Sequence, residues 1–178
     1  MKKYFIILIS ILIFFASVKM ARNFVNDKSQ YFEPKIINNE YLYDLGLQGR
    51  PVLRMRSVTL NGFHGPEHFG RWTSEPKSVV GNIQPPITKG KSINICGFAF
   101  IPNIGVTGVL NIGKSKYDIK FLSKESCHNF IYNGDLVVKK ITMEGFNTIS
   151  PKEIGINNDM RKLGVAIKSI EIKSIEIK

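Results

Sequence analysis

The residues best suited to chemistry gather in one stretch, Asn61–Glu75, with the sequence NGFHGPEHFGRWTSE. It contains Trp72, which is the only tryptophan of the chain, two of the three histidines, and the charged residues Glu67 and Arg71. An exposed indole beside a carboxylate and a guanidinium can stack on a sugar ring and hydrogen-bond its hydroxyl groups. The alternative is that Trp72 anchors the core while Glu67 and Arg71 form an ion pair that braces the loop. The residue types fit both interpretations.

A zinc site is the second chemistry that this stretch suggests. His64, Glu67 and His68 match the H-x-x-E-H pattern of one group of zinc peptidases. That chemistry needs both histidines on one face of a helix, with the glutamate polarising a zinc-bound water. Gly65-Pro66 interrupts any such helix, and no motif for a third ligand follows. We therefore interpret these residues as loop histidines and predict no metal here.

Other catalytic patterns give no positive indication. The chain has no G-x-S-x-G elbow, phosphate-binding loop or dinucleotide fingerprint, and its carboxylates are scattered. We expect no catalytic residues and no cofactor.

The first 22 residues predict export. Two lysines precede an uncharged, predominantly apolar run over residues 4–18, and Lys19 and Arg22 follow it. A cleavage site after Ala21 would place Lys19 where a small residue is required, so we favour an uncleaved signal anchor over a signal peptide. Either interpretation exports the remainder, and the anchor predicts a single-pass inner-membrane protein with its domain in the periplasm.

Charge argues against a nucleic-acid partner. The chain has 25 basic and 14 acidic groups, and its formal net charge is +11. The basic groups beyond residue 22 are spread thinly, whereas a nucleic-acid surface needs them clustered. A basic surface that faces anionic envelope polymers or lipid headgroups is the simpler interpretation.

The two cysteines, Cys96 and Cys127, can form a disulfide in an oxidising compartment. The alternative is two separate buried thiols, because the sequence gives no distance between them.

The bulk of the chain predicts an all-β fold. Residues 50–173 read as about eight short strands separated by turn residues, which is typical of a β-sandwich or jelly roll. Residues 23–49 read as a juxtamembrane linker, with a short helical turn possible over Glu40–Gly49. The expected strands are Val52–Leu60, Ser78–Ile83, Ile93–Ile101, Val106–Ile112, Tyr117–Phe121, Phe130–Tyr132, Leu136–Met143 and Leu163–Ile172.

The chain ends in a tandem repeat, SIEIK over 169–173 and again over 174–178. Because the repeat is five residues long and side chains alternate with period two, both copies cannot face the same core in one regular strand. We predict that the second copy, residues 174–178, is a frayed extension or follows a bulge, and that deleting it barely changes the melting temperature.

Four motifs together resemble a known family. Glu67–Trp72 resembles an "E-x-[WF]-G-R-W" signature, and Ala99–Gly105 resembles an "A-[FY]-x-P-N-x-G" run. Ser150-Pro151 and Asp159–Val165, similar to a closing "R-x-L-G-[IV]", follow in the same order. The family is a domain of uncharacterised role at the C-terminus of phosphoglycerol transferase I, which modifies osmoregulated periplasmic glucans, and of some multi-spanning envelope glycosyltransferases.

The resemblance implies an accessory β-sandwich without the transferase's catalytic unit. It implies binding of an envelope saccharide or assistance to a glycan-modifying enzyme, as a membrane-anchored domain. The alternatives are a structural or protein-interaction module without a sugar site, and an enzyme related to phosphoglycerol transferase. The ligand-binding residues that it implies are Glu67, Arg71, Trp72, Asn103, Asp159 and Arg161.

Overall fold

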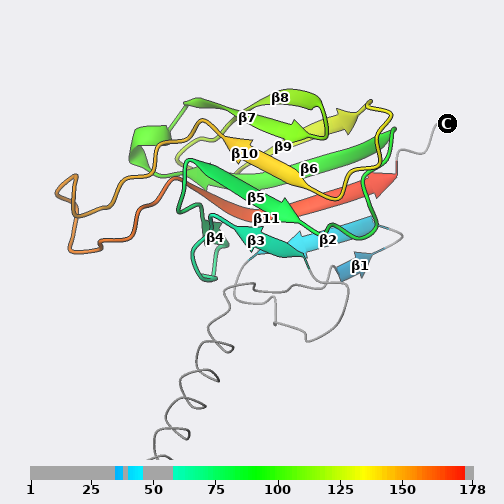
Figure 1. The fold of residues 1–178 in the computed structure, drawn as a ribbon. Coiled ribbons are helices and arrows are strands. Elements are labelled where there is room, and N and C mark those ends of the chain that lie inside the picture. The colour runs from blue at the N-terminus through cyan, green and yellow to red at the C-terminus, as the bar shows by residue number, and fades with distance from the viewer. Residues whose placement is uncertain (1–34, 38–39, 46–57, 175–178) are drawn as a thin grey trace, which may run out of the picture.

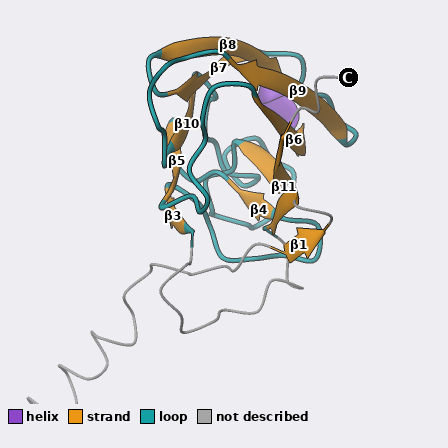
Figure 2. Ribbon diagram, turned by 90° about the vertical axis from the view of Figure 1, so that its right-hand side faces the viewer, coloured by secondary structure: helices purple, strands orange, loops and turns teal. Residues whose placement is uncertain are grey.

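The fold is a β-sandwich of two antiparallel sheets (Figures 1 and 2), which confirms the predicted all-β class. The computed structural model describes residues 35–37, 40–45 and 58–174. Its elements are β1 (Lys35–Ile37), β2 (Glu40–Asp44), β3 (Thr59–Asn61), β4 (Arg71–Trp72), β5 (Lys77–Gly81), β6 (Lys91–Ala99), the 3-10 helix η1 (Ile101–Asn103), β7 (Thr107–Ile112), β8 (Ser115–Lys120), β9 (Ser126–Tyr132), β10 (Ile141–Glu144) and β11 (Val165–Ser174).

The core lies between the two sheets. One sheet has the order β1-β2-β11-β6-β9, with β4 also paired to β11, and the other has the order β3-β5-β10-β7-β8. Ile93 and Ile95 of β6 face Leu110 and Ile112 of β7 in this core, and all four are fully buried. Side chains alternate along a strand, so the odd-numbered residues Ile93 and Ile95 of β6 point into the core.

A β-bulge at Lys168 keeps β11 amphipathic. Ile167 is opposite Gly97 and Ser169 is opposite Cys96, so Lys168 is an extra residue without an opposite partner on β6. One extra residue reverses the alternation of side chains, and the strand would otherwise turn its next apolar residues outward. Because of the bulge, both Ile167 and Ile170 are fully buried, and Ile172 is nearly so. The two isoleucines of the first SIEIK copy therefore share one face, and that face is the core.

Two expectations require correction. The helical turn expected over Glu40–Gly49 is wrong for Glu40–Asp44, which form β2 and pair with the edge of β11. The following residue, Leu45, is fully buried and donates its backbone NH to Lys168. The predicted linker therefore contributes to the sandwich, because β11 offers an open edge there. Arg71–Trp72, which we expected to be part of a loop, form the short strand β4, and β4 also pairs with β11.

The predicted signal anchor and the last four residues, 175–178, lie outside the described residues. Within residues 35–37, 40–45 and 58–174 there is no helix with the length and apolar character that crossing a bilayer requires.

Candidate functional site

A tight turn carries the central stretch onto the outer face of the six-stranded sheet. Glu67 and Gly70 exchange two backbone hydrogen bonds, with N···O distances of 2.8 and 3.2 Å. Gly70 has φ = +141°, and a Cβ atom there would lie 2.4 Å from the carbonyl oxygen of Ile167. Only glycine permits both this conformation and this close approach. The turn therefore packs on β11 and presents His68 and Phe69 at its tip.

Trp72 is the centre of an aromatic cluster on this outer face. Ala166 of β11 lies opposite both Trp72 of β4 and Phe98 of β6, so these three side chains form one row across the sheet. The Trp72 ring packs edge-on against Phe98, Phe69 and Phe100, with centroid distances of 5.3, 5.6 and 5.9 Å. Only 9 % of Trp72 is exposed. The indole therefore braces the cluster, and it offers no open face for stacking.

The rings around Trp72 are the ones that solvent reaches. Phe69, Phe98 and Phe100 are each half-buried against the cluster. His68 is exposed and packs edge-on against Phe69 at 4.9 Å. The aromatic contact that a ligand could make therefore belongs to these phenylalanines, which we name the aromatic patch.

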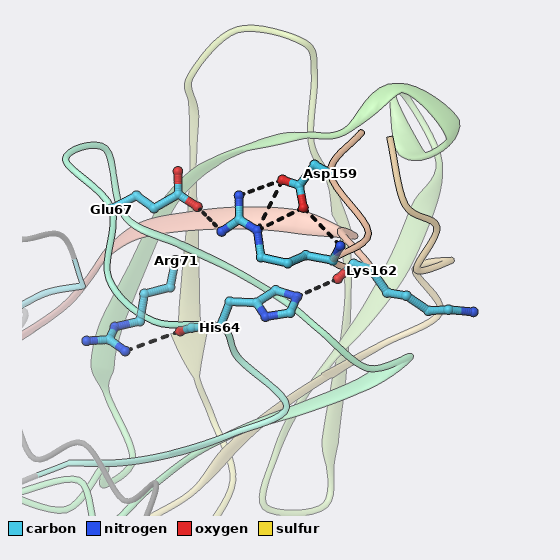
Figure 3. Close-up of polar contacts among 6 residues, drawn as sticks. His64, Glu67, Arg71, Asp159 and Lys162 are labelled. Carbon is cyan, nitrogen blue, oxygen red and sulfur yellow. Dashed lines mark hydrogen bonds and ion pairs between the residues drawn. The ribbon is translucent and has the colours of Figure 1, made fainter. Parts of the chain in front are cut away.

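Two carboxylates meet one guanidinium beside this patch (Figure 3). Arg161 donates from Nη1 to Glu67 Oε1 at 2.8 Å and from Nη2 to Asp159 Oδ2 at 2.7 Å. Its Nε also donates to both oxygens of Asp159, at 3.1 Å each. These hydrogen bonds lower the pKa of Asp159 to about 2 and raise the pKa of Arg161. We name Glu67, Asp159 and Arg161 the charged triad.

The triad joins two segments that are far apart in the sequence. Glu67 belongs to the turn before β4, whereas Asp159 and Arg161 belong to the long loop between β10 and β11. His64 makes a second link, because its Nε2 lies 2.7 Å from the carbonyl oxygen of Lys162 (Figure 3). The zinc-pattern residues therefore diverge: His64 contacts the loop backbone, Glu67 contacts Arg161, and His68 contacts Phe69.

Arg71 points away from this surface, into the interior. It is 2 % exposed, and it donates from Nε to the carbonyl oxygen of Leu45 at 3.1 Å and from Nη1 to that of His64 at 3.3 Å. Burial lowers its pKa to about 10, so it remains charged at neutral pH. Arg71 thus ties the end of β2 to the central stretch, and it does not pair with Glu67 as the bracing interpretation proposed.

Asn103 is also a bracing residue. Its side chain is fully buried, donates to the carbonyl oxygens of Asn147 at 2.7 Å and Gly164 at 3.2 Å, and accepts from the Asn147 NH at 2.8 Å. These three hydrogen bonds close both ends of the loop that carries Asp159 and Arg161. Asn103 therefore positions the charged triad without contacting it.

The six predicted ligand residues thus separate into two groups. Arg71, Trp72 and Asn103 are buried and hold the surface in place, while Glu67, Asp159 and Arg161 reach solvent beside the aromatic patch. Sequence reasoning missed Phe69 and Phe98. The sequence did contain a signal for both, since Phe69 lies inside the first motif and Phe98 lies on the outer side of an alternating strand. They were missed because apolar side chains were interpreted as packing residues.

Cys96 and Cys127 are directly opposite each other on β6 and β9 and form a disulfide, with Cα atoms 4.1 Å apart. The carboxylate of Glu125 lies near both sulfur atoms, and within the described part of the chain these form the one group of three potential metal ligands. Because both sulfurs are bonded to each other, neither is a thiolate that could bind a metal ion.

Comparison with solved structures finds two variants of the carbohydrate-binding module CBM29-2, one of them complexed with cellulohexaose. They are 7 % and 9 % identical to this chain, cover 76 % and 78 % of it and 92 % and 99 % of their own length, and have a TM-score of 0.43. Comparison with curated protein sequences gives no match. A family model described as a domain of unknown function, DUF7024, matches residues 38–174, and the chain therefore belongs to that family.

Proposed function

We propose that this protein is a non-catalytic saccharide-binding module. The observation that carries the proposal is the position of the charged triad at the edge of the aromatic patch. Glu67 and Phe69 belong to the same four-residue turn, so a sugar ring lying on Phe69 has carboxylate oxygens within reach of its hydroxyl groups. Aromatic faces and oriented acceptors are the two elements that sugar recognition requires.

The triad is built to accept hydrogen bonds. Three nitrogen atoms of Arg161 already donate to Glu67 and Asp159, which fixes both carboxylates and leaves their remaining lone pairs for a ligand. Two carboxylates against one guanidinium leave an excess of negative charge. A neutral hydroxyl-rich ligand therefore suits this position better than a phosphate or carboxylate.

The wider role follows from the resemblance in sequence. We infer that the domain is exported on an N-terminal anchor and assists an enzyme that modifies an envelope glycan or transfers phosphoglycerol. The triad and the aromatic patch would then hold the glycan for that enzyme, and the sandwich itself would carry out no reaction.

The direct test is a glycan panel of neutral and acidic envelope polysaccharides, followed by calorimetry on the full chain. We expect binding to a neutral glycan and a loss of roughly tenfold or more in affinity for Phe69→Leu, which keeps the apolar bulk but removes the ring. The double variant Glu67→Gln/Arg161→Gln should weaken binding similarly, because it releases the ordered carboxylates.

The matched control is Lys77→Gln/Glu144→Gln, which removes a surface ion pair on the other sheet. It should bind as the unaltered chain does. If the unaltered chain binds no glycan of the panel, the saccharide function is wrong. Equal binding by Phe69→Leu and the unaltered chain would instead remove the aromatic patch from the site.

A protein-interaction module is the second candidate, and a distinct observation favours it. Several large apolar side chains are exposed on η1, on the segment that follows β8, and on the loop between β10 and β11, which projects from one end of the sandwich (Figure 1). They are Ile101, Ile104, Leu122, Ile154, Ile156 and Met160. Exposed large apolar side chains are a common feature of docking surfaces. Substituting Ile156 and Met160 with serine should abolish capture of an envelope enzyme and leave glycan binding intact.

A further inference from the structure

The outer face of the six-stranded sheet continues beyond the aromatic patch as ordered rows of side chains. Residues that lie opposite each other on antiparallel strands project from the same face, so the pairing register fixes each row. Along β6 from Phe98, the rows are centred on Cys96, then on Asn94, then on Ser92. Their spacing by two residues places Asn94 about 13 Å from Phe98 along the strand. Figure 2 shows that this face points away from the other sheet.

The row centred on Asn94 is polar across three strands. Asn129 of β9 and Glu171 of β11 lie on either side of Asn94, and this row carries two amides and one carboxylate. Asn129 is exposed, and Asn94 and Glu171 are half-exposed. Asn94 uses its amide nitrogen in a long contact to Cys96 Sγ at 3.8 Å, and Asn129 uses its carbonyl oxygen toward the Ser92 hydroxyl. Among the described residues, the Asn94 carbonyl oxygen and the Asn129 amide nitrogen have no hydrogen-bond partner.

Two ion pairs lie on this face among the side chains that the structure describes. Lys168, the bulge residue, donates to Glu125 at 2.7 Å, which places an ion pair across β6 between the aromatic patch and the amide row. Lys173 lies 3.2 Å from Glu171 in a second pair. The chain as a whole carries a net charge of +11, whereas these two pairs contain as many acidic as basic groups. The described side chains between the aromatic patch and the amide row therefore give an anionic polymer no electrostatic advantage, and the amides offer hydrogen-bonding groups.

We propose that this face binds a linear, electrically neutral polysaccharide along β6, with one part of the ligand on the aromatic patch and another on the row of Asn94, Asn129 and Glu171. The inference rests on the saccharide-binding function proposed above and adds the ligand class, its direction and its length. Amides and a carboxylate flush with a sheet can pair with the hydroxyls of a sugar chain. The separation between patch and amide row exceeds one sugar ring, so full occupancy requires an oligomer.

The test is calorimetry on the full chain with neutral linear oligosaccharides of the glucose, mannose and galactose series, from disaccharide to hexasaccharide. We expect affinity to rise with length until both ends of the face are occupied. Asn94→Ala/Asn129→Ala should weaken the longest oligomer by roughly tenfold, which corresponds to losing two ordinary hydrogen bonds. The same variant should bind the disaccharide unchanged, since a short ligand occupies the aromatic patch alone.

Asn111→Ala is the matched control, because Asn111 is an amide on a strand of the other sheet that pairs with Glu144 at 2.9 Å. It should bind every oligomer as the unaltered chain does, and melting curves should show all variants folded. Affinity that is independent of length, or an unchanged hexasaccharide affinity in Asn94→Ala/Asn129→Ala, overturns the extended face while the aromatic site stands. Preference for a uronic-acid oligomer over the neutral series overturns the neutral ligand class. If no oligomer binds, the saccharide function and this inference both fail.

Discussion

Trp72 and Phe98 touch across an intervening strand, with ring centroids 5.3 Å apart and planes at 82°. They sit on β4 and β6, which are both paired to β11 and are therefore separated by it. The side chain between them is Ala166, which is fully buried beneath the two rings. A methyl group at this point is what lets an indole and a phenyl ring meet over the middle strand. The aromatic patch therefore depends on one small residue as much as on its large ones.

Trp72→Ala should lower the free energy of unfolding by about 3–5 kcal/mol, the range for truncating a buried large ring. Trp72→Phe should cost clearly less, because it keeps part of the edge-on packing against Phe69 and Phe100. Denaturant unfolding of the full chain measures both. A Trp72→Ala variant that keeps full stability and loses only glycan affinity would show that the indole is a ligand platform and not a brace.

Asn103→Ala should lower the free energy of unfolding by about 2–3 kcal/mol, because it leaves buried carbonyl and amide groups without partners. The side chain closes the loop between β10 and β11 at Asn147 and Gly164. We also expect faster backbone amide exchange at Asp159 and Arg161 than in the unaltered chain. Asn147→Ala is the control, since Asn103 contacts only the backbone of Asn147. If amide exchange at the triad does not change, the positioning role of Asn103 is wrong.

Much of the sandwich could be predicted from the alternation of side chains along the sequence. The elements that could not be predicted depend on the strands with which they pair. The alternation over Ile93–Ile101 predicted β6 as a strand but did not identify its core side, because both of its faces are largely apolar, and the same pattern found β7 and β8. β2 was missed because its strand conformation comes from the open edge of β11, far away in sequence. The last expected strand required a bulge at Lys168, which no local pattern marks.

The candidate site could be predicted in part only. The motif residues Glu67, Asp159 and Arg161 lie together, although 94 residues separate Glu67 from Arg161. Residue type alone suggested that Arg71 would pair with Glu67, but Arg71 lies on the inward side of β4 and meets backbone carbonyls instead. Which of the two side chains of β4 points inward depends on the alternation along that strand. A strand of two residues is too short to show a recognisable pattern in the sequence.

Asp159 should titrate at about 2 in the folded chain, well below its ordinary value of 3.8, because Arg161 donates hydrogen bonds to its ionised form. The lowered pKa means that this stabilisation is present above pH ~4 and is lost as the pH falls through about 2. Carboxylate NMR on the full chain measures the midpoint. Arg161→Gln should return it toward 3.8. An unshifted Asp159 in the unaltered chain would contradict the triad geometry.

Removing the disulfide should destabilise the domain without unfolding its core. Cys96 and Cys127 are 31 residues apart, and closing a loop of that length contributes roughly 3–4 kcal/mol by chain entropy. Neither cysteine belongs to the hydrophobic cluster between the two sheets, so Cys96→Ser/Cys127→Ser leaves that cluster complete. We expect a lower melting temperature, with the near-UV spectrum of the aromatic cluster retained below it. A variant with the same melting temperature as the unaltered chain would show that the disulfide contributes nothing measurable to stability.

Deleting Lys168 should prevent the sandwich from forming, whereas Lys168→Ala should be tolerated. The deletion removes the bulge residue, so a regular β11 would turn Ile170 and Ile172 to the outer face and bring polar Ser169 and Glu171 toward the core. It also removes the carbonyl that accepts from the Leu45 NH. Lys168→Ala keeps the backbone and loses only the exposed ion pair with Glu125, which is worth at most about 1 kcal/mol. Circular dichroism and thermal melting of the two variants distinguish these outcomes. If the deletion variant melts cooperatively near the unaltered chain, the register of β11 is not fixed by the bulge.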